Sequence, residues 1–150
     1  MVDNFLVLKY VKYCKTLYTR LIMKASKEYA LTQNECDVLL FLHNNPQFNT
    51  AKDVVINRLI AKSNVSTSVE SLKQKKYLTV KTDEENRRVV RIFLTEKADP
   101  VLVKLRKAQD EFEVILKGDM SEEEIELFFT LVEKNNSNVK NALAELEKED

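Results

Sequence analysis

The sequence contains very few residues that break helices: one glycine and two prolines among 150 residues. Average proteins contain about 7% glycine and about 5% proline, and sheet-rich folds place many of them in tight turns. This scarcity argues against a fold of many short strands, while a hydrophobic share of 44% is enough for a core at this length. We therefore predict a mainly α-helical protein organised as a single domain over residues 1–150.

Cysteine and histidine are also scarce, since Cys14, Cys36 and His43 are the only residues of these two types. The cysteine spacing fits no structural zinc motif, and a single histidine supports neither a catalytic triad nor a histidine-based metal cluster. No glycine-rich phosphate loop or nucleophile elbow appears in the sequence. We expect a protein that is not an enzyme and that uses no cofactor or metal.

Long hydrophobic runs are missing as well. The longest are residues 5–8 and 38–42, far below the roughly 20 residues that a membrane span requires. The amino terminus carries no basic segment followed by a small-residue cleavage site. The expectation is a cytoplasmic protein with no membrane partner, in which both cysteines are free thiols.

Charge is present in equal amounts of both signs, but it is unevenly distributed. The net charge is +2 over residues 1–49, +5 over residues 50–94 and −7 over residues 95–150. A basic middle segment predicts contact with a polyanion, and ordinary solvated helix faces are the alternative.

Hydrophobic periodicity predicts a long first helix over residues 3–29 with two apolar stripes. Two stripes require burial of more than one face, either inside the core or against a second chain. Thr32 with Glu35, and Thr50 with Asp53, have the spacing of capping boxes that open a second and a third helix. The third is expected to run through residues 54–60.

A fourth helix over residues 63–74 is expected to be capped by Ser63 or Asn64, with Val65, Val69 and Leu72 facing inward. Two β-rich runs, residues 78–81 and 89–94, flank a polar segment and predict a hairpin. A fifth helix opens near residues 95–96, restarts at residues 99–100 and ends at Gly118. A capping box over residues 121–124 opens the last helix.

A capped helix, a turn, a polar-faced helix and a hairpin, in this order, describe a winged helix-turn-helix. Residues 31–98 resemble the MarR family of transcription regulators. The matching motifs are Leu31-Thr32 with Val38-Leu39, Thr50-Ala51-Lys52-Asp53-Val54, Ser63-Asn64-Val65-Ser66 with Val69 and Leu72, and Arg87-Arg88 followed by Leu94-Thr95-Glu96-Lys97.

The resemblance implies a DNA-binding lobe over about residues 31–98, with dimerisation helices over residues 1–30 and 99–150. Three positions depart from the family pattern. Asn86 stands where the family has the wing aspartate that braces the neighbouring arginines, and Lys76 and Ala98 replace usual glycines. Lys76 must therefore adopt the left-handed conformation at a cost of about 1 kcal/mol, or the turn must be reshaped.

By this resemblance the protein is a homodimeric repressor that binds double-stranded DNA at a pseudo-palindromic operator. Relatives often release DNA when a small aromatic or lipophilic effector binds. For this role Tyr10, Tyr13 and Phe48 are candidates, although core packing explains them equally well.

The expected DNA-binding residues are polar or basic and lie on the third and fourth helices and in the wing. Arg87 is the candidate for the minor groove, while Arg88 contacts DNA or pairs with a nearby acid. Ser63 and Asn64 read bases, cap the helix, or do both, and the lysines contact phosphate or are only solvated. The set is Lys52, Lys62, Ser63, Asn64, Ser66, Thr67, Lys73, Arg87 and Arg88.

Two alternative functions follow from other features. Cys14 lies near the amino terminus, and oxidation there would make the protein a thiol-based redox-sensing regulator, but a buried and inert cysteine is the simpler interpretation. The winged helix would otherwise be a protein-interaction module, which the basic segment and the paired arginines make less attractive.

Overall fold

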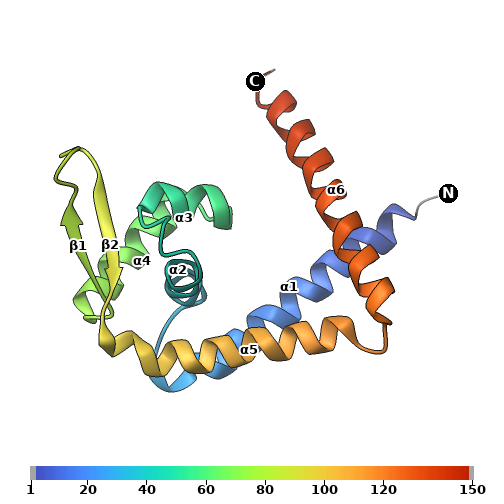
Figure 1. Ribbon diagram of the computed structural model, residues 1–150, viewed down its shortest axis with the longest axis horizontal. Helices are drawn as coiled ribbons and strands as arrows, with labels where there is room; N and C mark the ends of the chain where they lie inside the picture. The colour runs from blue at the N-terminus through green and yellow to red at the C-terminus, as the bar shows by residue number, and fades with distance from the viewer. Residues whose placement is uncertain (1–2, 149–150) are drawn as a thin grey trace. The chain divides into compact units, whose positions relative to one another are not determined.

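The computed structural model describes residues 3–148 and is mainly helical with one antiparallel hairpin, as predicted (Figure 1). It divides into two compact units, Met1–Phe112 and Glu113–Asp150. The elements are α1 (Asn4–Ser26), η1 (Lys27–Tyr29), α2 (Gln33–Asn44), α3 (Ala51–Arg58), α4 (Lys62–Gln74), β1 (Leu78–Thr82), β2 (Val90–Leu94), η2 (Glu96–Ala98), α5 (Asp99–Lys117) and α6 (Glu122–Leu146).

Local capping starts three of the helices where the sequence predicts. At α2, Thr32 Oγ1 accepts from the backbone N–H of Glu35, whose carboxylate accepts from the N–H of Thr32 at 2.7 Å. Thr50 and Asp53 form the same reciprocal pair at α3, and the capping box at residues 121–124 does so at α6. Each box satisfies two of the N–H groups that a helix start leaves without partners.

The boundaries of α3 and α4 differ from the prediction. α3 ends at Arg58, because Leu59 adopts a left-handed conformation with φ of 52° that turns the chain towards α4. α4 begins at Lys62, and its N-cap residue Ala61 contributes no side-chain hydrogen bond. The prediction that Ser63 or Asn64 caps this helix is therefore wrong: both residues lie in its first turn.

The ends of α1 and α5 follow the predicted pattern closely. α1 ends at Ser26 and continues as a 3-10 turn to Tyr29, so the predicted helix is correct except for its last turn. The fifth helix was expected to open near residues 95–96 and to restart at residues 99–100. In the structure the 3-10 turn η2 covers Glu96–Ala98, and α5 begins at Asp99. Gly118, with φ of +51°, ends α5 in the left-handed conformation that costs glycine little.

The core of the first unit is built around α2. Its residues 38–42 are all buried, so this short helix is enclosed on every side. From α4, Val65 and Leu72 are buried and Val69 is partly buried, which confirms the predicted inward stripe. Lys76 adopts the left-handed conformation, with φ of 66°, at the turn into β1.

The hairpin forms the wing, with β1 and β2 paired antiparallel from Leu78 opposite Leu94 to Thr82 opposite Val90. In the same unit α5 packs along α1. The rings of Tyr18 and Phe112 meet edge to face with centroids 5.4 Å apart, and Gln109 donates to the Tyr18 hydroxyl. The wing, α2, α3 and α4 therefore share one framework with the adjoining parts of α1 and α5.

Helix α6 makes up most of the second unit, and none of its residues Glu122–Leu146 is buried. Its large exposed apolar side chains are Leu127, Phe129, Leu131, Val132, Val139, Leu143 and Leu146. The amino-terminal half of α1 is exposed in the same way, with Phe5 82% and Leu8 67% accessible. Among residues 3–148 no helix has the length and apolar character needed to cross a membrane.

Candidate nucleic-acid interface

The outward face of α4 carries short polar side chains at its amino-terminal end. Ser63, Asn64, Ser66 and Thr67 are all exposed, while Val65 between them is buried in the core. Thr67 donates its hydroxyl hydrogen bond to the carbonyl of Ser63 at 2.9 Å. A helix end with exposed amide and hydroxyl groups has the size and chemistry to meet base edges in a major groove.

The three predicted lysines differ in their surroundings. Lys52 in the first turn of α3 and Lys62 at the start of α4 are both exposed. Lys73, near the end of α4, lies 3.1 Å from the carboxylate of Glu70 in an exposed ion pair. The hydrogen bond from Lys73 lowers the pKa of Glu70. The charge of Lys73 is therefore partly neutralised on the helix itself.

The loop of the wing exposes both predicted arginines. Within the described part of the chain, neither Arg87 nor Arg88 pairs with a carboxylate, so the ion pair considered as an alternative for Arg88 is not formed. Two of the three neighbouring acids bind other cations: Glu84 pairs with Lys81 at 3.2 Å and Asp83 with Arg91 at 2.7 Å. Both arginines thus stand in solvent on a loop whose acids are partly engaged.

Asp83 organises the wing loop through both carboxylate oxygens. Oδ1 accepts from the backbone N–H groups of Glu85 and Asn86 at 3.0 and 2.9 Å, and Oδ2 accepts from Nε of Arg91. Arg91 in turn donates to Oδ1 of Asn49 at 3.0 Å. The hydrogen bond from Arg91, helped by the Asn86 N–H, lowers the pKa of Asp83.

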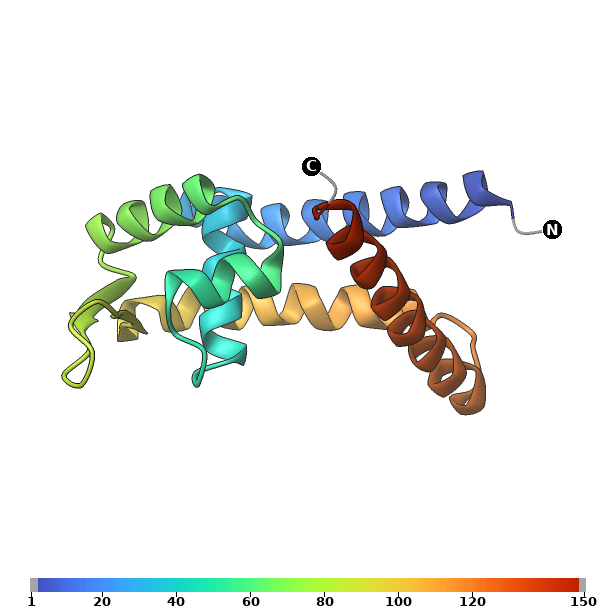
Figure 2. The same cartoon turned by 90° about the horizontal axis from the view of Figure 1, so that it is seen from above.

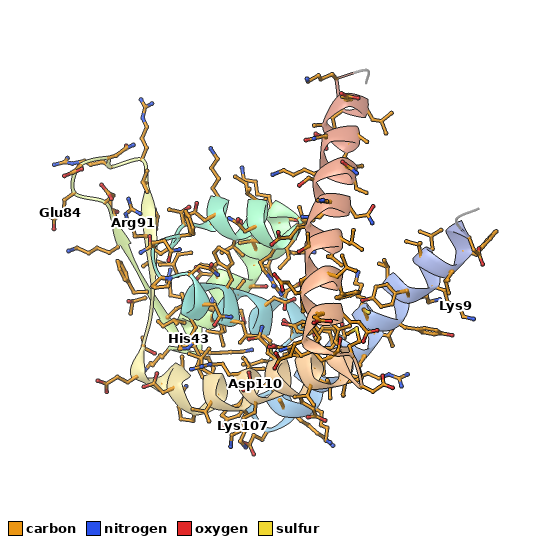
Figure 3. The ribbon with its side chains drawn as sticks, turned by 45° about the vertical axis from the view of Figure 1, so that its right-hand side comes forward. Lys9, His43, Glu84, Arg91, Lys107 and Asp110 are labelled. Carbon is orange, nitrogen blue, oxygen red and sulfur yellow. The ribbon has the colours of Figure 1, made fainter. Side chains whose placement is uncertain are left out.

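Sequence analysis did not identify this cluster, because Asp83 and Arg91 look like ordinary charged residues of a hairpin. The available signal was the family aspartate replaced by Asn86, which left the loop without its expected brace. In the structure, the side chain of Asn86 accepts only from the backbone N–H of Arg88, at 3.1 Å. Figure 3 places Glu84 at the outer part of the wing and Arg91 closer to the helices.

A buried carboxylate connects α2 to α4. The side chain of Glu35 is 3% exposed and accepts from Ser71 at 2.5 Å and from Lys75 at 2.9 and 3.0 Å. Burial raises the pKa of Glu35, but the hydrogen bonds from Lys75, Ser71 and the Thr32 N–H outweigh burial and lower it. Glu35 was expected only as a capping residue, and the structure adds that it holds α4 in place.

The three candidate effector residues do not lie side by side. Tyr10 and Tyr13 are exposed on the amino-terminal half of α1, which extends away from α2, α3 and α4 (Figure 2). Phe48 is 45% exposed in the turn between α2 and α3. Core packing does not account for them either, because all three are exposed.

A different groove lies between α1 and α5, with a volume of about 650 Å³. Its lining combines three apolar residues with four lysines and two glutamates, and one of these lysines, Lys104, pairs with Glu28. The lining residues are Leu21, Lys24, Ala25, Lys27, Glu28, Lys104, Lys107, Ala108 and Glu111. None of the predicted effector residues contributes to it.

The two cysteines have different environments. Cys36 is fully buried in α2, and burial raises the pKa of its thiol to about 11. Cys14 is partly buried on α1, in hydrogen-bond contact with Tyr10. Burial and this contact raise the pKa of Tyr10 to about 12.

We expect Cys36 to resist iodoacetamide in the folded protein at neutral pH, because the reactive species is the thiolate and burial disfavours it. The measurement is the alkylation rate of each cysteine by mass spectrometry, with denatured protein as the control. Labelling of native Cys36 at the denatured rate would contradict the expectation. Labelling of Cys14 faster than in the denatured chain would favour the redox alternative.

The comparisons with known proteins agree with this geometry. Residues 31–89 match the family model of the MarR family. A putative MarR-family regulator from Listeria monocytogenes, solved with a 26mer DNA, has a TM-score of 0.83 at 17% identity, over 99% of this chain and 96% of that one. No curated protein matches the sequence.

Two further solved structures share the fold. MepR from S. aureus, solved in complex with DNA, has a TM-score of 0.76 at 20% identity, over 91% of this chain and 96% of its own. BpsR from Bordetella bronchiseptica is described as regulated in its DNA binding by 6-hydroxynicotinic acid. It has a TM-score of 0.69 at 21% identity, over 87% of this chain and 98% of its own. Between 87% and 99% of the chain thus shares the fold of these proteins.

Proposed function

We propose that the chain, whose residues 31–89 match the model of the MarR family, is a winged-helix regulator that represses transcription as a homodimer on a pseudo-palindromic operator. The observation that carries the proposal is the exposed wing loop, where Arg87 and Arg88 have no acidic partner among residues 3–148. An unpaired guanidinium on a narrow loop suits the minor groove, where A·T-rich DNA concentrates negative potential.

Helix α4 supplies the base-reading residues in this proposal. Its exposed amino-terminal residues, Asn64 and Ser66 foremost, contact base edges in the major groove, where asparagine pairs with adenine and serine with several bases. Lys52 and Lys62 contact phosphates and add affinity that falls with salt. Lys73 adds less, because Glu70 already pairs with it.

A second copy of the chain covers the exposed apolar side chains of α6 and of the amino-terminal half of α1. Exposed apolar surface on this scale is unusual for a monomer and typical of an oligomer interface. A two-fold dimer presents two copies of α4 to successive major grooves, about one helical turn apart, which is why the operator is expected to be a pseudo-palindrome.

Release of DNA by a small aromatic or lipophilic effector completes the proposal. It is supported by the fold shared with BpsR, whose DNA binding is described as regulated by 6-hydroxynicotinic acid. An effector acts by binding more tightly to the conformation of the dimer in which the two copies of α4 are wrongly spaced for the operator. Tyr10 and Tyr13 are one helical turn apart on α1, and Phe48 can join them only where a second copy of the chain brings it near.

The experiment that tests DNA binding is a fluorescence-anisotropy titration of Arg87→Ala beside the wild type. The duplexes are the intergenic DNA upstream of the protein's own gene and a scrambled sequence, each at about 50 mM and about 200 mM salt. Loss of one minor-groove arginine should weaken binding to the specific duplex by about tenfold.

Arg20→Ala is the matched control, because Arg20 is exposed on α1 and its removal changes the net charge equally. The control should leave the specific affinity close to wild type. Equal and weak binding of both duplexes by the wild type, unchanged by Arg87→Ala, would contradict the proposed function and favour a protein-interaction module.

A further inference from the structure

The wing loop of this protein is held from inside by one carboxylate. Asp83 stands at the start of the loop and accepts from the N–H groups of Glu85 and Asn86, the two residues that lead to Arg87. Backbone groups bound in this way fix the path of the chain, because each bond removes a torsional alternative from the loop.

The same carboxylate is anchored outside the wing. Arg91, on β2, bridges Asp83 and the side chain of Asn49 in the turn between α2 and α3. The backbone strengthens this junction, since the N–H of Ile92 donates to the carbonyl of Asn49 at 2.8 Å and Arg91 pairs with Thr50 as an isolated β-bridge. Thr50 caps α3, so the wing loop is tied to the helix-turn-helix.

We propose that Asp83 and Arg91 are positioning residues that aim Arg87 at the minor groove, in place of the aspartate that Asn86 has replaced. This inference rests on the proposed function. Neither residue touches DNA in the proposal: Asp83 shapes the loop, and Arg91 fixes the loop relative to α3. A DNA-contacting side chain on a loop is effective only if the loop is already ordered before binding.

The role of Asp83 can be tested by whether its removal strengthens or weakens DNA binding. A carboxylate in a DNA-binding loop repels phosphate, so its removal by itself should strengthen binding. If Asp83 holds the loop, its removal should instead weaken specific binding. Asparagine at this position keeps one acceptor oxygen, so it cannot serve both the two backbone N–H groups and Arg91.

The experiment compares Asp83→Asn with Glu85→Gln, its matched control, in the same anisotropy titration. Both changes turn an acid of the same loop into its amide and remove one negative charge, but the carboxylate of Glu85 takes no part in the brace. Asp83→Asn should weaken specific binding by about fivefold to tenfold, and Glu85→Gln should leave it equal or slightly tighter. Tighter binding by both variants would overturn the proposal.

A double-mutant cycle separates positioning from general destabilisation. If Asp83 acts through Arg87, then Asp83→Asn should have little further effect once Arg87 is alanine. Full additivity of the two losses would overturn the positioning role.

Hydrogen exchange of the free protein tests the brace without DNA. The amides of Glu85 and Asn86 should exchange faster in Asp83→Ala, which removes the oxygen that accepts from both of them, while those of the α2 core keep their wild-type rates. Unchanged exchange in the loop would overturn the brace. If the wild type does not distinguish the two duplexes while the loop amides still exchange faster in the variant, then the proposed function fails and the brace stands.

Discussion

Replacing Leu143 with glutamate is expected to convert the proposed dimer into monomers and to weaken operator binding by about 10² to 10⁴-fold. Leu143 lies on the apolar side of α6 and is 54% exposed in the single chain. A two-fold interface buries both copies of a residue, so one substitution places two unpaired carboxylates in an apolar contact. The loss of affinity follows because two linked half-site contacts become one.

The control for this change is Asn141→Glu, which introduces the same charge two residues away. At 100° per residue the two side chains point to roughly opposite sides of α6, so Asn141→Glu should leave the dimer intact. Light scattering on the eluting protein gives the mass, and anisotropy gives the affinity. A dimeric mass for Leu143→Glu at micromolar concentration would remove this part of α6 from the proposed interface.

Glu35→Ala is expected to lower the free energy of unfolding by about 2–3 kcal/mol and to loosen α4. The change deletes a buried acceptor, which leaves the Thr32 N–H and the Ser71 hydroxyl without their partner, and hydrogen bonds to a charged group are worth more than neutral ones. Lys75 is 36% exposed and can return to water, which keeps the loss below that of a fully buried pair. Urea unfolding at neutral pH measures the difference.

Glu70→Ala is the matched control, because Glu70 is an exposed acid on α4 whose ion pair with Lys73 stands in solvent. Exposed pairs contribute little to stability, so this variant should unfold close to wild type. A loss in Glu35→Ala no larger than in Glu70→Ala would show that the buried carboxylate does not hold α4.

The contribution of Glu35 should also depend on pH. Its pKa in the folded protein lies below the ordinary glutamate value of 4.5, so the unfolded chain binds the proton first as pH falls. The stabilisation is therefore complete above the unfolded pKa and is lost as pH falls through the folded value. The difference between wild type and Glu35→Ala should shrink well below pH 4.5, and a constant difference would contradict this linkage.

Capping explains why so much of the fold was predictable. The boxes at Thr32 and Thr50 each join residues three positions apart, so the local sequence contains everything needed to start the helix. The hairpin follows from two β-rich runs with a polar link. The left-handed conformation of Lys76 is one of the two alternatives that its place in the family pattern left open. Where a turn depends on packing, as at Leu59, the same reasoning placed the end of α3 too late.

Parts of the candidate interface could not be predicted, because the residues that complete it come from distant segments. Arg91 and Asn49 are 42 positions apart, and Glu35 meets Ser71 and Lys75 across 36 and 40 positions. Which acid takes which cation depends on the distances that folding sets. From the sequence, an ion pair between Arg88 and a nearby acid was therefore one of two alternatives. In the structure Asp83 pairs with Arg91 instead.

The sequence by itself determined the helical class and the order of elements, because these depend on hydrogen bonds and periodicities within a few residues. The candidate DNA-facing residues stay a prediction that follows from the resemblance to the MarR family. Only the tertiary structure decided that α4 is held by a buried glutamate, that the wing is braced by Asp83 and Arg91, and that α6 leaves its apolar side chains exposed. The physical reason is that burial and ion pairing depend on neighbours in space, and the fold brings these neighbours together from distant parts of the chain.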